Sequence, residues 1–579
     1  MRYILRPMRA FSRLLDRLAL TPSRNAKLVL VRDYLKTAPD PDRGWALAAL
    51  TGDLVFHAAK PAMIRKAAEA RVDPVLFGWS WNYVGDLAET VALIWPVDPS
   101  RRPNREPELS EVVEALKSAK RDEVQGLLEG WLDALDPISR WALLKLVTGE
   151  LRVGLSSRLA KTAAAMIRPE RKPLPPSPGE DDEQGEPLEP VDVSEIEEVW
   201  HAVSAPYGDL FAWLEGRSER PSAAAPGRFR PVMLAHALDE AVDFDKLDPA
   251  DYAAEWKWDG IRVQAVCEGG EQRLWSRTGD EISRAFPDLM VALKFDGAVD
   301  GELLVIRDGA VAPFADLQQR LNRKTVDAKL IKGFPAAIRA YDLLTDSGED
   351  TRGLPFDERR RRLEAFVARH ASERLSLSPL VPFDSWDELA RLRADPPVGA
   401  AAEGLMLKRR DSAYQSGRPK GPWFKWKRDP YLIDAVLMYA QRGSGRRSSF
   451  YSDYTFGVWT EDGQLAPVGK AYFGFTDEEL KLIDKFVRDH TVDRFGPVRA
   501  LRADRDFGLV FEVAFEGLQR SGRHRSGVAM RFPRISRIRW DKPAREADTL
   551  VTVFALLDRI EAGGGRALPP TSDPAKTAS

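Results

Sequence analysis

The hydrophobic pattern of this chain changes close to residue 230, and this change limits the folds that the chain can adopt. The first 168 residues contain Ala- and Leu-rich segments with recurring charged faces, which predict amphipathic helices. From Arg230 to about Lys427, short β-rich runs alternate with helical segments, which is typical of an α+β domain. The 579 residues also exceed what one hydrophobic core can organise. We therefore expect several domains, of which the first is all-α.

One helix of the first region can be placed in detail. Asp136 is suited to cap its N-terminus, Pro137 fits the first helical position, and Gly149 can end it. The apolar face is expected at Ile138, Trp141 and Ala142, which have helical spacing. The helix leads into the sequence Glu-Leu-Arg-Val-Gly-Leu at 150–155.

Two polar stretches mark the organisation of the chain. Residues 169–192 contain seven prolines and an acidic run, so we expect a disordered insertion there. Helical pattern resumes at 193–214, and the Pro-, Ala- and Gly-rich residues 217–230 predict a domain boundary. The expected domains are 1–220, 228–429 and 430–560, with a flexible tail at 561–579.

The third domain is expected to be a small β-barrel with one helix. Strand-like runs occur at 435–439, 455–459 and 509–515. Thr476 and Glu479 have the spacing of a capping box, which predicts the start of the helix.

Composition excludes several classes of protein. There is no apolar run long enough for a membrane span and no signal-peptide pattern at the N-terminus, so we expect a cytoplasmic protein with no membrane partner. Cys267 is the only cysteine, which excludes intrachain disulfides and a zinc site of several thiolates. The net charge is −2, yet residues 520–542 hold eight Lys or Arg against one acid, so a polyanionic partner remains possible.

The strongest chemical signal begins at Lys257. This lysine lies between Trp256 and Trp258 and directly precedes Trp258-Asp259-Gly260. A lysine can act as a nucleophile when its surroundings favour the neutral amine. The string Lys-x-Asp-Gly is short and recurs by chance, so its interpretation depends on the residues downstream of it.

Further motifs occur downstream in a fixed order. They are Ser276–Gly279, Asp300–Leu303, Tyr341–Leu344, Glu403–Lys408, Trp423–Lys427, Arg531–Arg534 and Arg539–Lys542. Together with the lysine segment, this series resembles motifs I, Ia, III, IIIa, IV, V and VI of the covalent nucleotidyltransferases, and it is most similar to the ATP-dependent DNA ligases. The helical first region resembles the DNA-binding domain of that family. The resemblance covers nearly the whole chain except the acidic insertion and the tail, and it is strongest to three-domain bacterial ligases. It implies a DNA-binding domain, an adenylation domain and an OB-fold barrel, in a monomeric enzyme of the bacterial cytosol.

The resemblance also implies residue roles. Lys257 would carry AMP, Glu255 would meet the adenine edge, Tyr341 would stack on the purine, and Arg262 and Glu302 would lie at the ribose. Phosphate or nucleotide contacts are implied for Arg277, Lys408, Arg418, Lys425 and Lys427. Glu302 and Glu403 would hold Mg²⁺ or Mn²⁺, since hard cations prefer oxygen ligands. Arg539, Asp541 and Lys542 of motif VI would orient pyrophosphate.

Two positions depart from the family pattern. The spacing from Arg418 to Lys425 is one residue longer than usual, and Tyr341 stands where Phe is more common, although a phenol ring can also stack. Each residue taken alone also has a structural alternative: Glu302 and Glu403 as surface carboxylates, Tyr341 as a core aromatic, and residues 531–542 as a solvated basic face.

The expected function is sealing of nicked duplex DNA with ATP in repair, recombination or replication. An RNA ligase or RNA-capping guanylyltransferase would share most motifs, but neither needs the long helical region. An NAD-dependent ligase would carry a four-cysteine zinc site, which one cysteine cannot form. A DNA-binding scaffold without catalysis would be expected to lose the lysine, the carboxylates or the cations, and all are present.

Overall fold

The computed structural model divides the chain into two compact units, Met1–Ala225 and Pro226–Ser579. The structure describes residues 7–84, 86–96, 105–149, 151–171, 186–222, 226–307, 309–321, 323, 326–370, 372–397, 401–442, 451–472, 474 and 476–562. Most of the expected insertion, at 172–185, and of the expected tail, at 563–579, therefore lies outside the described residues.

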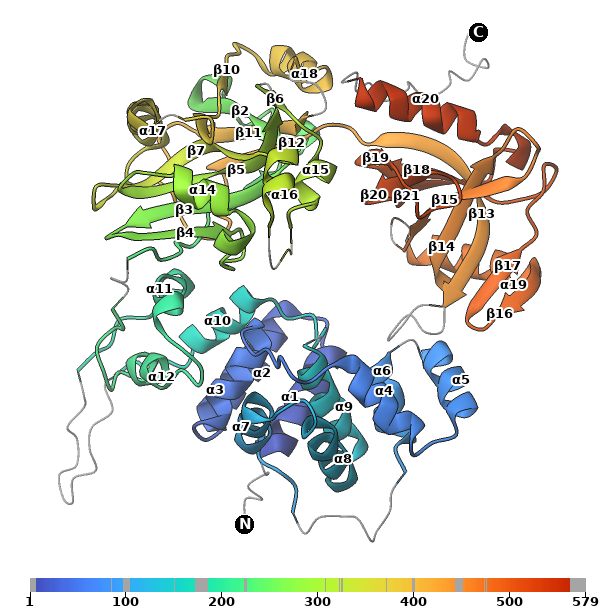
Figure 1. Cartoon of the computed structure of the whole chain (residues 1–579), viewed down its shortest axis with the longest axis horizontal. Coiled ribbons are helices and arrows are strands. Elements are labelled where there is room, and N and C mark those ends of the chain that lie inside the picture. Colours follow the sequence, from blue (N-terminus) through green and yellow to red (C-terminus); the bar gives the residue numbers. More distant parts are fainter. Residues whose placement is uncertain are drawn as a thin grey trace. The chain divides into compact units, whose positions relative to one another are not determined.

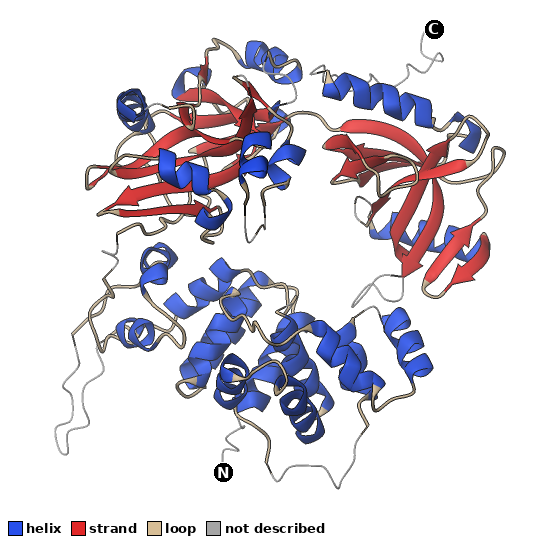
Figure 2. Cartoon of the chain, viewed as in Figure 1, coloured by secondary structure: helices blue, strands red, loops and turns tan. Residues whose placement is uncertain are grey.

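The first unit is helical in its described part (Figures 1 and 2). This confirms the helical N-terminal region. The helices are α1 Pro7–Leu20, α2 Arg24–Thr37, α3 Asp42–Thr51, α4 Pro61–Glu69, α5 Pro74–Val84, α6 Leu87–Ile94, α7 Leu109–Ser118, α8 Val124–Ala134, α9 Pro137–Thr148, α10 Ser157–Ala165, α11 Val193–Val199 and α12 Gly208–Leu214. The pattern predicted at 193–214 is interrupted, because a 3₁₀ turn and a loop separate α11 from α12.

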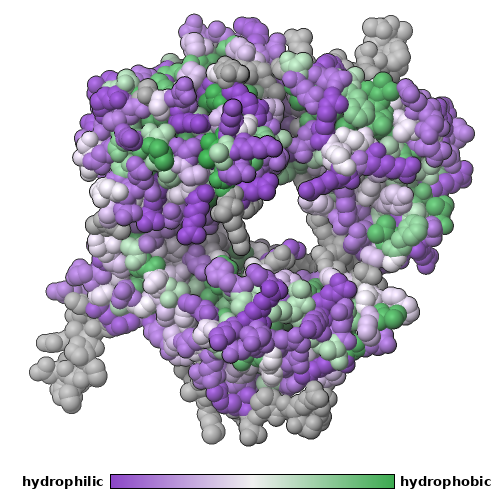
Figure 3. All heavy atoms as spheres, viewed as in Figure 1, coloured by the Kyte–Doolittle hydropathy of each residue, from purple (hydrophilic) through white to green (hydrophobic). Residues whose placement is uncertain are grey.

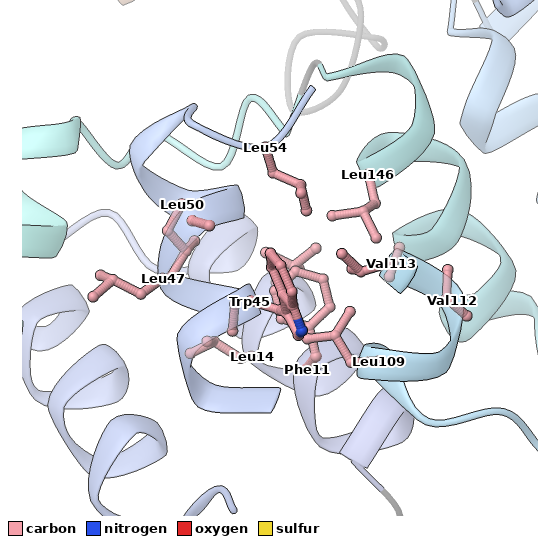
Figure 4. Close-up of a cluster of buried hydrophobic side chains, with 14 of the residues drawn as sticks. Phe11, Leu14, Trp45, Leu47, Leu50, Leu54, Leu109, Val112, Val113 and Leu146 are labelled. Atoms are coloured by element: carbon pink, nitrogen blue, oxygen red, sulfur yellow. The ribbon is translucent and has the colours of Figure 1, made fainter. Parts of the chain in front are cut away.

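One continuous apolar core holds these helices together. Trp45 of α3 lies at its centre, with Phe11, Leu109 and Val113 from two other helices around it (Figure 4). The side chain of Phe11 is fully buried, and burial of one such aromatic contributes about 1.5–3 kcal/mol. Packing between helices, more than local propensity, therefore fixes this unit.

The termini of α9 agree with the sequence prediction, and Trp141 and Ala142 of its predicted apolar face pack into the core, whereas Ile138 does not. The Asp136 carboxylate accepts a hydrogen bond from the Ser139 amide at 2.8 Å, and Gly149 adopts a left-handed conformation with φ 71°. Ile138, however, is 47% exposed. The helix is buried over most of its circumference, so three apolar positions did not define the face that packs.

The second unit begins with two β-sheets (Figure 2). The larger has the order β4-β3-β5-β7-β8, with β6 beside β5 and β9 beside β7; the smaller has the order β1-β12-β11-β2-β10. Their bounds are β1 His236–Ala237, β2 Tyr252–Trp258, β3 Ile261–Glu268, β4 Glu271–Ser276, β5 Gly297–Arg307, β6 Ala310–Val311, β7 Ala336–Asp346, β8 Glu349–Asp350, β9 Leu375–Leu377, β10 Leu380–Val381, β11 Ala402–Arg409 and β12 Trp423–Lys427.

Helices cover these sheets and complete an α+β fold. They are α13 Glu240–Asp243, α14 Pro287–Ala292, α15 Phe314–Gln318, α16 Ala328–Gly333, α17 Phe356–His370 and α18 Trp386–Ala394. Leu363 and Phe366 of α17 enter the core of the larger sheet, and Leu389 of α18 enters that of the smaller. The predicted β-runs at 262–266, 298–306, 337–344 and 404–408 all lie within strands.

The rest of the second unit is a mainly antiparallel β structure. A sheet runs β15-β14-β13-β17-β16, and β18 pairs with both β13 and β21. The elements are β13 Tyr431–Arg442, β14 Tyr451–Trp459, β15 Leu465–Ala471, α19 Asp477–Asp489, β16 Thr491–Phe495, β17 Val498–Leu501, β18 Val510–Phe515, β19 Gly517–Arg520, β20 Val528–Arg531, β21 Arg534–Arg539 and α20 Leu550–Glu561.

This region has a second helix that the sequence prediction missed. The capping box of Thr476 and Glu479 opens α19 as expected. The additional helix α20 buries Val553, Leu556 and Leu557 against the strands. The prediction of a barrel with one helix was therefore wrong in its helix content.

The visible surface is mainly hydrophilic, with apolar residues scattered among polar ones (Figure 3). Within the part of the chain that the structure describes, no helix has both the length and the apolar character needed to cross a membrane.

Candidate active site

A cavity of about 420 Å³ collects most of the motif residues singled out in the sequence. Its size lies within the range of small-molecule sites. The cavity is lined by eleven of the residues singled out in the sequence: Glu255, Lys257, Arg262, Arg277, Glu302, Tyr341, Glu403, Lys408, Arg418, Lys425 and Lys427. These residues come from strands of both sheets or from the loops beside them. The fold thus brings together side chains that lie far apart in the sequence.

Lys257 is positioned by the regular alternation of β2. It is partly exposed to the cavity, whereas its neighbours Trp256 and Trp258 are buried.

The turn after the strand approaches β5 closely. A side chain at Gly260 would place its Cβ 2.5 Å from the Leu303 carbonyl oxygen, so only glycine fits there. The Asp-Gly step therefore fixes the path of the chain beside the lysine.

The amine of Lys257 forms an ion pair with the Glu403 carboxylate. Glu403 lies where the pairing of β11 with β2 is irregular. The next residue, Gly404, has φ 143°, and a Cβ there would lie 2.2 Å from the Trp426 carbonyl oxygen. This local irregularity, which the spacing of the motif does not reveal, presents Glu403 to the lysine.

Glu302 is the second carboxylate of the cavity wall. It stands opposite Arg262 in the pairing of β5 with β3. Burial raises the pKa of Glu302 to about 8, although Lys257 and Arg262 act in the opposite direction, and the charge of Glu403 raises it further. Glu302 and Glu403 are therefore close enough to influence each other.

Four further cations line the cavity, and one of them, Lys427, lies 3.8 Å from Glu403. Lys425 and Lys427 are alternate residues of β12 and share one face, while Phe424 and Trp426 point into the core. Arg277 and Arg418 stand on loop positions. Burial, then the charges of Arg418 and Lys427, lowers the pKa of Lys425. Such crowding of like charges is favourable only when an anion binds among them.

Glu255 is buried and has two cationic partners. Its Oε2 lies 2.7 Å from the Lys408 Nζ, and its Oε1 accepts a hydrogen bond of 2.9 Å from Arg360. The Lys408 amine also donates to the Tyr341 carbonyl oxygen at 3.0 Å and lies 4.6 Å from the centre of the Tyr341 ring. Lys408 therefore belongs to the Glu255 and Tyr341 side of the cavity.

Arg262 is held firmly by protein groups. Its guanidinium makes two hydrogen bonds to the buried Asp300, at 3.0 and 2.5 Å. It also donates to the Met233 carbonyl oxygen at 2.6 Å and to the Tyr414 hydroxyl at 3.0 Å. Its orientation is consequently fixed before any ligand binds.

The C-terminal β region also contributes to the cavity. Arg531 donates to both oxygens of Asp259 at 2.6 Å, and Lys427 donates to Glu516 at 2.9 Å. Arg531, Phe532 and Glu516 line the cavity. Asp259 thus links the lysine motif to a strand that lies 272 positions later in the sequence.

The three motif VI residues do not line this cavity. Lys542 pairs with Asp434 at 2.6 Å, and Arg539 pairs with Asp541 at 2.8 Å and with Asp434 at 3.4 Å. In this structure the two cations of motif VI are therefore paired with acidic side chains of the protein and do not contribute to the cavity.

Several residues of the site were not assigned roles from the sequence. Asp300 and Arg531 fall inside motifs identified in the sequence, but the sequence analysis gave these two residues no role. Arg360, Tyr414 and Glu516 reach the site from elements outside those motifs, and only the fold reveals them.

The carboxylates fit a shared Mg²⁺ better than a metal site made by protein alone. Among the described residues, no group of three or more His, Cys, Asp or Glu side chains gathers as a complete metal site. Mg²⁺ commonly uses one or two carboxylates together with substrate phosphates and water. Glu302 and Glu403, on the wall that also holds Lys257, match that requirement.

Comparisons with known proteins identify families and relatives that this chain resembles. Residues 232–427 match the family described as "ATP dependent DNA ligase domain", and residues 447–542 match the "ATP dependent DNA ligase C terminal region". A probable DNA ligase of Koribacter versatilis is 30% identical, over 94% of this chain and 95% of that protein. DNA ligase 1 of Korarchaeum cryptofilum is 29% identical, over 95% and 98%. The solved structure "Pmar-Lig_PreS3" has a similar fold, with a TM-score of 0.57 and 15% identity over 91% of this chain and 99% of that one.

The raised pKa of Glu302 predicts a pH-dependent stability. Between pH 4.5 and about 8 the folded protein retains a proton that the unfolded chain releases, so stability should fall as pH rises through this window. Glu302→Gln removes the titration. Wild type should therefore lose stability relative to this variant by up to about 1.4 kcal/mol per pH unit, and the loss should level off above pH 8. Thermal unfolding of both proteins from about pH 5 to about pH 9 measures the difference; a constant difference would contradict the prediction.

Proposed function

The chain belongs to the family of ATP-dependent DNA ligases, and from this premise we propose that it seals 5′-phosphate/3′-hydroxyl nicks in duplex DNA through AMP carried on Lys257, in DNA repair, recombination or replication. One observation carries the proposal. The amine of Lys257 opens into a cavity that also holds two carboxylates and a group of four cations. That arrangement suits transfer of a nucleotide from a polyphosphate to the lysine.

Three bond exchanges make up the proposed reaction. The neutral amine of Lys257 attacks the α-phosphorus of ATP, an N–P bond forms, and the bond to pyrophosphate breaks. The adenylate then passes to the 5′-phosphate of the nick and frees the lysine. Finally the 3′-hydroxyl attacks that phosphate, forms the phosphodiester and releases AMP. The Lys257 amine is paired with Glu403 in this structure, so this pair must separate and the amine must be neutral before the first step.

The remaining roles are assigned from position in the cavity. We propose that Lys425 and Lys427 balance charge on the phosphates, with Arg277 and Arg418 as further contacts. Arg277 also meets the 5′-phosphate of the nick. Glu255, Lys408 and Tyr341 would form the adenine side, while Arg262 and Glu302 would lie at the ribose.

Glu302 and Glu403 are the proposed ligands of Mg²⁺ or Mn²⁺. When bound, the divalent cation would offset negative charge on the phosphates. Binding would also engage the carboxylate that now holds Lys257. The protein's own contribution is to place both carboxylates beside the nucleophile.

We propose that the helical region at 1–220 is a DNA-binding domain and that residues 430–560 form an OB-fold barrel, on either side of the adenylation domain at 228–429 in the sequence. A nick can occur in any sequence, so contacts should be directed at phosphates and groove shape. Affinity for nicked duplex should consequently fall steeply as salt is raised.

Motif VI is proposed to act in a different position of the barrel. The cations of Arg539 and Lys542 pair with Asp434 and Asp541 here, outside the cavity. Rotation of the barrel on ATP binding would bring them to the β- and γ-phosphates, where they would orient the departing pyrophosphate. The barrel would then turn back and offer DNA another face.

The covalent adenylate provides the most direct test of the proposed function. Wild type incubated with α-labelled ATP and Mg²⁺ should retain label through denaturing electrophoresis. Lys257→Ala and Lys257→Arg should retain none, because neither side chain supplies a nucleophilic amine. Protein freed of bound AMP should not be able to seal a nick with NAD as its sole nucleotide. Label on the alanine variant would disprove the assignment of Lys257.

A second prediction concerns the helical region. Deleting residues 1–220 should leave formation of the adenylate largely intact, because the cavity lies wholly within the second unit. Binding of nicked duplex should weaken by at least about tenfold, the effect of roughly 1.4 kcal/mol of lost contacts. Equal nick binding and sealing by the truncated protein at moderate salt would refute the assignment of this region to DNA.

The third prediction separates motif VI from a static DNA-binding surface. Lys542→Ala should slow self-adenylation by at least about tenfold, equivalent to roughly 1.4 kcal/mol of transition-state stabilisation. Sealing of a nick that already carries 5′-AMP should be almost unchanged. Arg537→Ala on the neighbouring strand β21, exposed and paired with Glu512, is the matched control and should affect neither step. Equal losses in both assays for Lys542→Ala would show that this cluster serves DNA binding instead.

A further inference from the structure

Arg360 is a buried cation behind the wall of the nucleotide cavity. It lies on α17, and its side chain is 6% exposed. It does not line the cavity, but it reaches Glu255, which does. No motif in the sequence includes it, and it stands 105 positions from its partner.

Arg360 has defined partners on several sides. One terminal nitrogen donates to Glu255 Oε1 at 2.9 Å and to the Ser378 carbonyl oxygen at 2.8 Å. The Nε donates to Glu364, one helical turn further along α17, at 2.8 Å. Ser378 is buried, and its hydroxyl receives a hydrogen bond from the indole of Trp258 beside the lysine. Arg360 is therefore held in a single orientation and presents its charge to Glu255.

The other groups that face Glu255 explain why a second cation matters. Lys408 approaches from β11 at 2.7 Å, and the buried Asp342 of β7 adds an opposing negative charge. Glu255 is 2% exposed, and its burial raises its pKa even though both cations lower it. A carboxylate so far from water stays ionised only with strong compensation. Without Arg360, Lys408 would be the one remaining cationic partner of this buried carboxylate among the described residues.

We propose that Arg360 sets the purine specificity of this nucleotide site by holding Glu255 as an oriented, ionised hydrogen-bond acceptor. An ionised carboxylate has acceptor positions beyond the two used by Arg360 and Lys408, and it has no proton to donate. It can accept from the 6-amino group of adenine, whereas the 6-oxo group of hypoxanthine or guanine offers only another acceptor. Arg360 is thus a positioning residue that acts on the base through Glu255. This inference rests on the proposed function.

Arg360→Gln tests the proposal in the full-length protein. Self-adenylation with ATP and with inosine triphosphate, which differs at the 6-position, gives kcat/KM for each nucleotide. The variant should lose at least about tenfold of its preference for ATP over inosine triphosphate, mainly through a higher KM for ATP. Arg361→Gln, an exposed position on the same helix paired with Glu358, is the matched control and should change the preference by less than about twofold.

The pH profile separates charge compensation from simple support of the fold. In Arg360→Gln, Glu255 should take up a proton at a higher pH than in wild type, so the preference for ATP should decline as the pH is lowered, and it should do so at a higher pH than in wild type. Arg360→Lys retains the positive charge and should restore most of the preference and the wild-type profile. A purely structural role predicts equal losses for both nucleotides and an unchanged profile, and this result would overturn the proposal.

A double-mutant cycle covers the case in which Arg360→Gln does not fold. Arg360→Lys should lower the preference slightly, by about threefold, because a lysine cannot reproduce the three hydrogen bonds of the guanidinium to Glu255, Ser378 and Glu364. In a Glu255→Gln background the same substitution should have no further effect on the preference. An equal effect in both backgrounds would show that Arg360 does not act through Glu255. If wild type took no label from ATP at all, the proposed function itself would fail, and the two failures are therefore distinguishable.

Discussion

An excess of positive charge around Lys257 is the constraint on which the site depends. Eight cationic and four acidic side chains line the cavity. Burial keeps one of the acids, Glu302, protonated up to about pH 8, which increases the imbalance near neutral pH. In the free protein the repulsion is limited by pairing, as between Lys257 and Glu403 and between Lys427 and Glu516. A bound polyphosphate would replace these pairs with stronger, fixed contacts.

Charged side chains are paired within the protein in one part of the cavity and, among the described residues, lack acidic partners in another. Around Glu255, each carboxylate oxygen has its own buried cation, and Arg262 is likewise fixed by Asp300. This end is organised before a ligand arrives. At the other end, Lys425, Arg277 and Arg418 crowd together, and burial and like charge lower the pKa of Lys425. The base of a nucleotide would thus contact a rigid wall, and its phosphates would contact cations that have no acidic partner in the described part of the chain. This difference favours one orientation of the nucleotide in the cavity over the opposite one.

The sequence was most informative where chemistry is local. Alternation along β12 placed Lys425 and Lys427 on one face, and the caps of α9 and α19 were correct, because each depends on residues a few positions apart. The missed features depend on tertiary structure. The contacts of Arg360 with Glu255 and of Arg531 with Asp259 join residues 105 and 272 positions apart, and no spacing rule covers them.

Helix α20 was missed and Ile138 of α9 was wrongly predicted to be buried, for related reasons. The first turn of α20 contains Val551, Thr552 and Val553, β-branched residues that favour strands, and its cap pairs Thr549 with Thr552 where a Glu is more usual. Its helical state is stabilised by burial of Leu556 and Leu557 against the strands. In α9, helices on several sides bury polar and apolar positions alike, so hydrophobic spacing alone could not identify the packing face.

The pairing of motif VI bears on how the proposed rotation of the barrel could be reversible. Lys542 and Arg539 already have Asp434 as a partner. When the barrel rotates, these two cations would therefore exchange their contacts with Asp434 for contacts with the phosphates of ATP. Each such contact contributes only about 1.5–3 kcal/mol net, so the two positions would differ by a small free energy. ATP would favour the position in which its phosphates replace Asp434, and release of pyrophosphate would remove that preference. Asp434 would then recapture the cations, and the barrel would return without any further energy source.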